Sequence, residues 1–186
     1  MKRLFDISFA FFACFLLLMP MSIIAVIIKC SSKGPVLYWS DRVGRDNHLF
    51  KMPKFRTMQI DTPAVATHLL SDPDRYLFPV GKFLRKTSLD ELPQFLSILK
   101  GDMSFVGPRP ALFNQEDLIE QRTSKGIHVL LPGLTGWAQI NGRDELPIPV
   151  KVEYDFYYFE NHSFLLDCKI IFITFLKTLR YEGVSH

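Results

Sequence analysis

The sequence lacks the short motifs that mark the common nucleotide-binding and hydrolytic folds. We find no GxGxxG, no GxxxxGK[ST] phosphate loop, no GxSxG and no HExxH among the 186 residues. The five histidines are scattered without the spacing of metal ligands, so we interpret them as surface residues or as core residues with partners. The common nucleotide folds are therefore unsupported.

Cysteine and net charge are also scarce. Cys14, Cys30 and Cys168 have no CxxC spacing and lie in or beside apolar segments. This pattern argues against a disulfide framework or a zinc site and indicates a reducing, cytoplasmic exposure. The formal net charge of +3 and the absence of basic runs predict no nucleic-acid partner, although a basic face would suit an anionic membrane or a phosphate substrate.

Apolar residues are abundant instead. They make up 48% of the chain, which is high for a soluble protein. Residues 5–28 form one run, FDISFAFFACFLLLMPMSIIAVII, which is about long enough to cross a bilayer and has Asp6 as its only charge. The run is longer than the apolar region of a signal peptide and contains no Ala-x-Ala cleavage site, so we expect it to be retained.

Two arrangements of this segment remain open. Residues 1–30 could cross the bilayer as a straight helix, or they could form a helix–break–helix that is kinked at Pro20 and leaves by the leaflet it entered. Basic residues flank both ends, so the positive-inside rule gives no direction. We favour the re-entrant form because it keeps both basic ends in the cytoplasm. These flanking residues are Lys2, Arg3, Lys29, Lys33 and Arg42.

Residues 31–186 contain no repeat, low-complexity tract or linker, so we expect one integrated domain. Residues 36–40 and 49–58, separated by the turn-forming GRDN, predict a β-hairpin. A helix is expected near residues 112–122. The last block is aromatic and then helical, and its final helix should lie along a membrane surface or pack in the core. The cluster of Tyr and Phe residues at 154–159 could lie at the level of the lipid headgroups or form an ordinary aromatic core.

Two adjacent acids, Asp90 and Glu91, stand before an apolar stripe at helical spacing that ends at Gly101. Ser88 and Glu91 fit the capping-box pattern, in which the acids only start a helix. Pro93 favours a helix that begins near Asp90. A carboxylate in that position would be held ionised and could act as the nucleophile of a phosphoryl transfer. Both interpretations remain open on these residues alone.

Several cations could complete a phosphate site. Arg109 lies between two prolines in GPRP, which would aim its guanidinium at low entropic cost, although a structural salt bridge is the alternative. Lys54 and Arg56 in KFRTM could equally form a solvated strand face. Arg143 follows an Asn-Gly turn and could be a solvated residue. Further polar candidates are Arg85, Lys86 and Asp155.

The motifs KFRTM, LRKTSLDELPQFLSILKGDMSFVGPRP, PGLTGWAQINGR and YDFYY follow one another in this order behind the hydrophobic segment. This series closely resembles the bacterial sugar transferase family, the small monotopic phosphoglycosyl transferases, from about residue 2 to residue 183. No further span precedes residue 2, so we expect the minimal catalytic form of that family.

The resemblance implies an α+β fold that is mostly helical and membrane-anchored through an N-terminal re-entrant helix kinked at Pro20, with interfacial amphipathic helices and a small β-hairpin. The implied enzyme faces the cytoplasm from the bacterial inner membrane. It takes a sugar 1-phosphate from a UDP-sugar, releases UMP and passes the phosphosugar to a polyprenol phosphate such as undecaprenyl phosphate. This reaction is ping-pong and is the first membrane step of a glycoconjugate pathway.

The resemblance also implies residue roles. Asp90 corresponds to the aspartate that becomes phosphoglycosylated, Glu91 is the second acid of the dyad, and both would hold Mg²⁺. Arg85, Arg109, Arg143 and Asp155 fall on motif positions that line the family's substrate site. Lys54 and Arg56 are expected as further substrate-binding residues on the strength of their own charge in KFRTM.

Two other functions remain open, namely a catalytically silent membrane scaffold and a membrane nucleotide-sugar hydrolase or phosphatase. Expected partners include membrane phospholipids, a homodimer is compatible with the sequence, and the transferred sugar is not specified by it.

Overall fold

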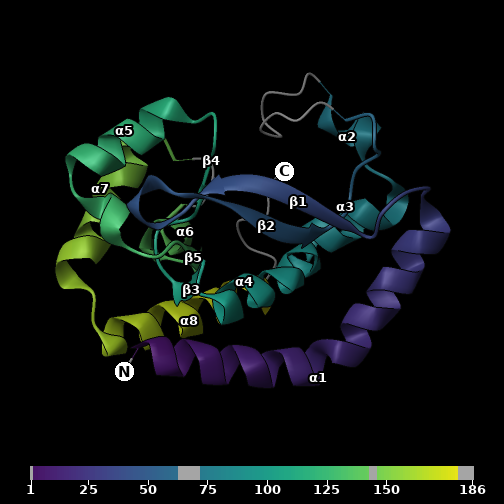
Figure 1. The fold of residues 1–186 in the computed structure, drawn as a ribbon, viewed down its shortest axis with the longest axis horizontal. Helices are drawn as coiled ribbons and strands as arrows, with labels where there is room; N and C mark the ends of the chain where they lie inside the picture. The colour runs from purple at the N-terminus through teal and green to yellow at the C-terminus, as the bar shows by residue number, and fades with distance from the viewer. Residues whose placement is uncertain (1, 63–71, 143–145, 180–186) are drawn as a thin grey trace.

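The computed structural model describes residues 2–62, 72–142 and 146–179, and these residues form an α+β fold that is mostly helical, as expected (Figure 1). The α-helices are α1 (Lys2–Ser31), α2 (Pro73–Tyr76), α3 (Pro79–Lys86), α4 (Phe95–Lys100), α5 (Glu116–Ser124), α6 (Trp137–Ile140), α7 (Ile148–Asn161) and α8 (Phe164–Leu179). Short 3-10 helices are η1 (Arg45–Asn47), η3 (Leu89–Gln94) and η4 (Ile127–Val129). The strands are β1 (Leu37–Val43), β2 (Leu49–Phe55), β3 (Ser104–Val106), β4 (Ala111–Leu112) and β5 (Gly133–Thr135).

The predicted β-hairpin is confirmed. β1 and β2 pair antiparallel, and Asp46 and Asn47 make the turn with positive φ angles of 53° and 61°. The sheet order is β2-β1-β4, so β2 is an edge strand. An edge strand tolerates Pro53, whose missing N–H would break a central ladder. β4 pairs with the end of β1 and so brings the chain after residue 110 onto the hairpin.

A second, two-stranded sheet pairs β3 and β5 in parallel. Here two backbones approach so closely that no side chain fits between them. A Cβ atom on Gly133 would lie 2.1 Å from the backbone nitrogen of Gly107, and a Cβ on Gly107 would lie 2.3 Å from the carbonyl oxygen of Leu131. The GPRP motif and the PGLTG motif are therefore held together by backbone contact.

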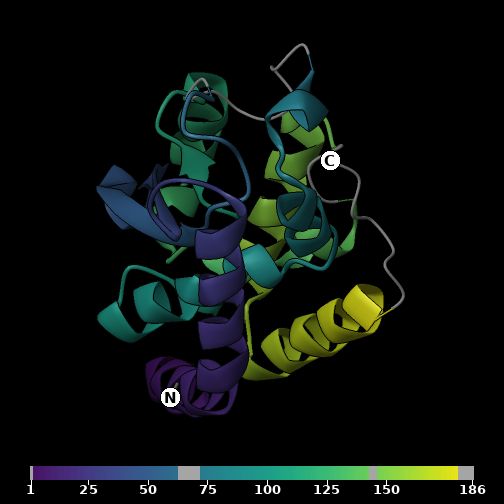
Figure 2. The same ribbon diagram turned by 90° about the vertical axis from the view of Figure 1, so that its right-hand side faces the viewer.

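The helix α1 packs on the domain in two parts on either side of Pro20. Figure 1 shows its ribbon bending, and Figure 2 shows the N-terminal part nearly end-on while the remainder rises away from it. Ala10 in the first part packs in a core with α4, β3 and α8. Ile24 and Ile28 in the second part pack against Phe55, a residue of β2.

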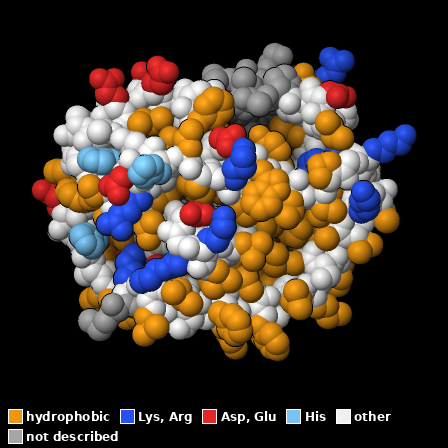
Figure 3. Space-filling view, in the orientation of Figure 1, with side chains coloured by type: hydrophobic (Ala, Val, Ile, Leu, Met, Phe, Trp, Pro, Cys, Tyr) orange, Lys and Arg blue, Asp and Glu red, His pale blue; other side chains and the backbone are white. Residues whose placement is uncertain are grey.

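Much of α1 nevertheless presents large apolar side chains outward. By length and composition it is the one helix within the described ranges that could cross a membrane. Exposed apolar residues on α8 extend the same surface, and Phe5 of α1 contacts Phe164 of α8 edge to face at 5.3 Å. Figure 3 shows hydrophobic side chains gathered along the lower edge, where α1 runs. Prominent members are Phe11, Phe12, Phe15, Leu18, Met19, Val26, Leu165, Phe172 and Phe175.

The polar residues at the start of α1 are bonded to the rest of the domain. Asp6 is buried and accepts hydrogen bonds from the Ser104 hydroxyl at 2.8 Å and from the backbone N–H of Phe105 at 3.2 Å. Arg3 donates to the carbonyl oxygens of Ile98 and Leu99 at the end of α4. These bonds offset the burial of a charge in an apolar helix and fix the N-terminal part of α1 against β3 and α4.

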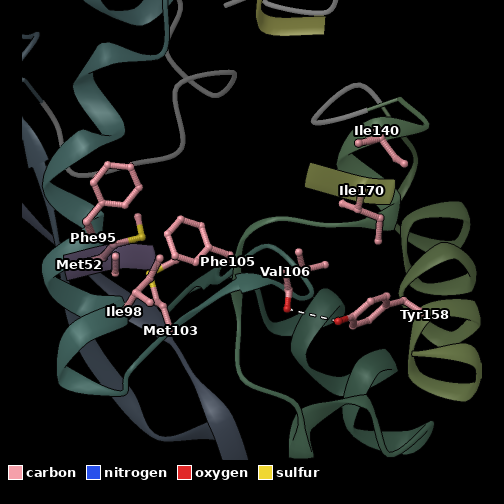
Figure 4. Close-up of a cluster of buried hydrophobic side chains, with 10 residues drawn as sticks. Met52, Phe95, Ile98, Met103, Phe105, Val106, Ile140, Tyr158 and Ile170 are labelled. Atoms are coloured by element: carbon pink, nitrogen blue, oxygen red, sulfur yellow. Dashed lines mark hydrogen bonds between the residues drawn. The ribbon is translucent and has the colours of Figure 1, made fainter. Parts of the chain in front are cut away.

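The main hydrophobic core joins the hairpin to the C-terminal helices (Figure 4). Met52 of β2 meets Phe95 and Ile98, and Tyr158 of α7 donates a hydrogen bond to the carbonyl oxygen of Val106 at 3.3 Å. Tyr158 is only 2% exposed, so this member of the aromatic cluster belongs to the core. The three cysteines are free, as expected.

Candidate active site

The acidic pair lies in the 3-10 helix η3 instead of the first turn of an α-helix. Ser88 precedes η3 with a left-handed φ of 57°, and its side chain makes no capping hydrogen bond. The capping-box prediction is therefore wrong. Pro93 falls near the end of η3, and α4 begins only at Phe95, so the acids stand one turn before the helix proper. Gly101 ends α4 with a φ of 105°, as predicted.

The Glu91 carboxylate joins three separate segments. Its Oε1 accepts a hydrogen bond from Lys54 Nζ of β2 at 2.8 Å and another from Arg109 Nη2 at 3.0 Å. Burial alone would raise the pKa of Glu91, but the two cations outweigh burial and hold that pKa well below its usual range. Glu91 is therefore ionised near neutral pH, and it fixes the directions of both cations.

Asp90 is the more deeply placed acid. Its side chain is buried, and burial raises its pKa to about 6, against the opposing effect of Lys54, Arg85 and Arg109 and with the added effect of Glu91. Three cations thus surround two carboxylates, which leaves one positive charge in excess when both acids are ionised. Such a site favours an anionic ligand such as a phosphate.

Arg85 reaches this cluster from the last turn of α3. Its Nε donates to the Thr57 hydroxyl at 3.0 Å, and it interacts electrostatically with Asp90. Burial lowers the pKa of Arg85, and Asp90 opposes that shift. α3 lies directly on the KFRTM segment, because a Cβ on Gly81 would come within 2.1 Å of the carbonyl oxygen of Thr57. The structure therefore brings Lys54, Arg85 and Arg109 to the dyad.

Arg56 lies elsewhere. Its guanidinium is buried and donates to the carbonyl oxygen of Pro35 at 2.6 Å and to those of Ser32 and Lys33. It thus closes the turn that follows α1, and these bonds direct it away from the dyad. Arg143 lies outside the described residues.

Asp155 lies behind Arg109. It is 1% exposed, and its Oδ2 accepts two hydrogen bonds from Arg122, at 3.0 Å from Nε and at 2.6 Å from Nη2. Burial raises the pKa of Asp155, and Arg122 opposes that shift. Arg122 in turn donates from Nη1 to the backbone carbonyl oxygen of Arg109 at 2.8 Å. These contacts connect Asp155 to the dyad through two arginines.

The sequence patterns gave no site role to Arg122 or to Arg42, which they marked only as a basic residue after the hydrophobic segment. Arg42 of β1 donates to the carbonyl oxygen of Pro110 at 3.1 Å. Arg122 follows Leu118 by four residues, so both lie on the buried face of α5. The sequence pattern that could have identified Arg122 is its helical spacing from the apolar Leu118. This pattern is weak because the segment is otherwise polar.

Asp90 and Glu91 could hold a magnesium ion only if a bound phosphate and water supply its other ligands. Mg²⁺ binds through one or two carboxylates, keeps several waters and completes its shell with phosphate oxygens. Asp90 and Glu91 could supply those carboxylates. Residues 2–62, 72–142 and 146–179 contain no cluster of three or more His, Cys, Asp or Glu side chains able to hold a metal. The chemistry of the site therefore suits an ion that arrives with a phosphate ligand.

Comparisons with known proteins give matches along nearly the whole chain. The family described as "Bacterial sugar transferase" matches residues 1–181. The chain is 41% identical over 187 residues to "Uncharacterized sugar transferase EpsL" of Bacillus subtilis (strain 168), which covers 100% of this chain and 90% of that relative.

Two relatives carry more specific names. The chain is 39% identical over 184 residues to the "UDP-N-acetylgalactosamine-undecaprenyl-phosphate N-acetylgalactosaminephosphotransferase" of Aeromonas hydrophila, covering 96% of this chain and 43% of that relative. It is 41% identical over 185 residues to the "UDP-glucose:undecaprenyl-phosphate glucose-1-phosphate transferase" of Escherichia coli (strain K12), covering 95% and 40%. The chain thus spans about two-fifths of the length of these two relatives.

Proposed function

This chain belongs to the bacterial sugar transferase family, as its motifs predicted, and from that membership we propose that it transfers a sugar 1-phosphate from a UDP-sugar to undecaprenyl phosphate and releases UMP. The names of two relatives describe this kind of reaction. The observation that carries the proposal is the buried Asp90 carboxylate beside Glu91, faced by Lys54, Arg85 and Arg109.

The proposed reaction takes two steps at one phosphorus atom. In the first, an Asp90 oxygen attacks the phosphorus that carries the sugar, an aspartyl O–P bond forms, and the bond to the bridging oxygen breaks, so that UMP leaves with the electron pair. In the second, a phosphate oxygen of the polyprenol phosphate attacks the same phosphorus and the Asp90 carboxylate leaves. A covalent carrier suits two substrates that approach from different phases, and ping-pong kinetics follow.

The other residues bind and orient. Lys54 and Arg109 donate hydrogen bonds to Glu91. The same cations would contact the oxygens of the transferred phosphate. Arg85 interacts electrostatically with Asp90. Asp90 and Glu91 would hold Mg²⁺, which neutralises negative charge on the diphosphate when bound. Arg143 stays a proposed substrate-binding residue, whereas Arg56, whose guanidinium is bonded to the turn after α1, would only hold that turn in place.

We further propose that α1 enters and leaves the cytoplasmic leaflet of the inner membrane without crossing it. Three observations support this: Pro20 lies between the two packed parts of the helix, Asp6 and Arg3 tie its N-terminal part to the domain, and its remaining surface is apolar. Phospholipids would then contact α1 and α8. The acceptor phosphate could reach Asp90 while its tail stayed in lipid, and withdrawing that tail would cost about 0.8 kcal/mol per CH₂.

The direct test is UMP release from a panel of UDP-sugars by the purified protein in membranes or nanodiscs. We expect one or a few donors to yield UMP. Without undecaprenyl phosphate the release should stop after about one UMP per enzyme, and with it release should continue and a lipid-linked phosphosugar should form. Sustained release of UMP without the acceptor would instead indicate a nucleotide-sugar hydrolase. No UMP from any donor would favour the catalytically silent scaffold.

A further inference from the structure

The backbone that carries Arg109 is held in an unusual way. Pro108 and Pro110 have no N–H, so this segment supplies few donors to a sheet, and its carbonyl oxygens need donors from elsewhere. Three consecutive carbonyls receive them. Those of Pro108, Arg109 and Pro110 accept from the Gly133 N–H at 2.9 Å, from Arg122 Nη1 at 2.8 Å and from Arg42 Nη1 at 3.1 Å.

The two guanidinium donors come from different elements. Arg42 belongs to β1, and Arg122 belongs to α5, which packs against α7. Arg122 is itself fixed, because Asp155 accepts from two of its nitrogens and both side chains are almost fully buried. A buried guanidinium that makes three hydrogen bonds to two fixed acceptor atoms has little freedom.

The Arg109 side chain, by contrast, does not take part in holding this backbone and extends to Glu91. It is 31% exposed, and its Nη2 lies 3.0 Å from Glu91 Oε1. We propose that Arg42, Arg122 and Asp155 are positioning residues which hold the Pro108–Pro110 backbone, so that the Arg109 guanidinium meets Glu91 and the phosphate. This inference rests on the proposed function and assigns Asp155 a role through Arg122 instead of contact with substrate.

The primary variant is Arg122→Lys, which keeps the positive charge beside Asp155. One ammonium group cannot reproduce the planar fork that reaches Asp155 and the Arg109 carbonyl together. We expect UMP release to fall about ten- to hundredfold, as small misplacements of a catalytic group do, with little change in Tm. Arg42→Lys should give a smaller loss of the same kind and serves as the second variant if Arg122→Lys fails to fold.

The chain offers a matched control on the same two elements. Lys125, just after α5, pairs with Glu153 of α7 at 2.5 Å, but this pair is more exposed, and among the described residues it makes no hydrogen bond to the Pro108–Pro110 backbone. Asp155→Asn should slow turnover, whereas Glu153→Gln should leave it at the wild-type rate. Equal losses in both would show that any ion pair between these helices matters.

The decisive measurement is a double-mutant cycle on kcat/KM. If Arg122 acts through Arg109, Arg122→Lys has no further effect in an Arg109→Ala background. Independent, multiplying losses would overturn the proposal, and so would wild-type turnover by Arg122→Lys.

Deuterium exchange gives a readout that does not need activity: peptides covering residues 103–113 should exchange faster in Arg122→Lys than in Glu153→Gln. Wild-type protein that releases no UMP would refute the proposed function, while unchanged exchange would refute the positioning role separately.

Discussion

At the scale of single residues, Asp90 and Glu91 are neighbours with opposite electrostatic environments. Glu91 takes the hydrogen bonds of Lys54 and Arg109 and stays ionised, while burial raises the pKa of Asp90 to about 6. Pairs of acids whose pKa values are pushed apart are a common way to separate chemical roles. The proposed nucleophile is therefore Asp90, whose ionisation is opposed by burial and favoured by the nearby cations.

A pH dependence follows from this. Asp90 must be ionised to attack, so the rate of the first half-reaction should fall about tenfold per pH unit below about pH 6. Among the cations that lower the pKa of Asp90, Lys54 has the largest effect. Lys54→Met should therefore move the acid limb of the pH–rate profile to higher pH. Lys51→Met is the control, since Lys51 lies on the same strand and pairs with Asp41 at the surface. An acid limb that stays in place in Lys54→Met would contradict this account.

Ionisation of Asp90 is needed for activity but should lower the free energy of unfolding. Its folded pKa lies above the ordinary value of 3.8, so the folded state binds the proton more tightly, and ionisation near neutrality destabilises it. Asp90→Asn should therefore stabilise the inactive protein by about 1–3 kcal/mol at pH 7.5. The gain should shrink as pH falls through 6 and be nearly gone at pH 4. Thermal unfolding at the two pH values measures it, and a lower Tm for Asp90→Asn at pH 7.5 would be the contrary result.

At the scale of elements, the sequence predicted most of what local pattern determines. The hairpin followed from β-prone residues around GRDN, and Gly101 marked the end of α4. The predicted helix near 112–122 exists but begins later, at Glu116. The motif resemblance located the dyad, with Lys54, Arg85 and Arg109 beside it, whereas residue patterns alone left those assignments open.

Elements that depend on distant contacts were not predictable. β3 and β5 have three residues each and pair across a long stretch of chain, which no local periodicity reveals. The capping box failed because Ser88 adopts a left-handed conformation and the Glu91 carboxylate is held by Lys54 and Arg109 instead. Arg122 was missed because its acceptors, Asp155 and a backbone carbonyl, come from other segments.

The contact between β3 and β5 can be tested with glycines. Gly133→Ala would place a Cβ 2.1 Å from the Gly107 nitrogen, a backbone atom that cannot move aside alone, so we expect a loss of at least about 2 kcal/mol. Gly126→Ala is the comparison, because its Cβ meets nothing closer than 3.8 Å and only its φ of 74° is strained, at about 1 kcal/mol. Equal Tm values for the two variants would show that the strands are not in such close contact.

At the scale of the whole molecule, the domain and its apolar helix form one packed unit. α1 contributes Ala10 to one core cluster and Ile24 and Ile28 to another, and Lys2 reaches Asp167 of α8. A helix so fastened at both ends places its exposed apolar surface on one side of the molecule. This arrangement supports the proposal that α1 stays in one leaflet.

Topology labelling tests that arrangement. The three native cysteines are replaced by serine, and one new cysteine is placed either before residue 1 or at the exposed Ser124. Both positions should react with an impermeant maleimide only when the cytoplasmic face is accessible. Protection of Ser124→Cys together with labelling of the N-terminal cysteine from the periplasmic side would mean that α1 crosses the bilayer.

Intact mass spectrometry can detect the proposed covalent bond between the Asp90 side chain and the phosphorus that carries the sugar. The membrane-solubilised enzyme is incubated with its UDP-sugar and without the lipid acceptor. We predict a mass increase of one sugar phosphate on the wild-type chain, no increase on Asp90→Asn, and loss of the adduct when undecaprenyl phosphate is added. Turnover by a wild-type enzyme that never carries this adduct, or by Asp90→Asn, would show that the reaction does not pass through an aspartyl phosphosugar.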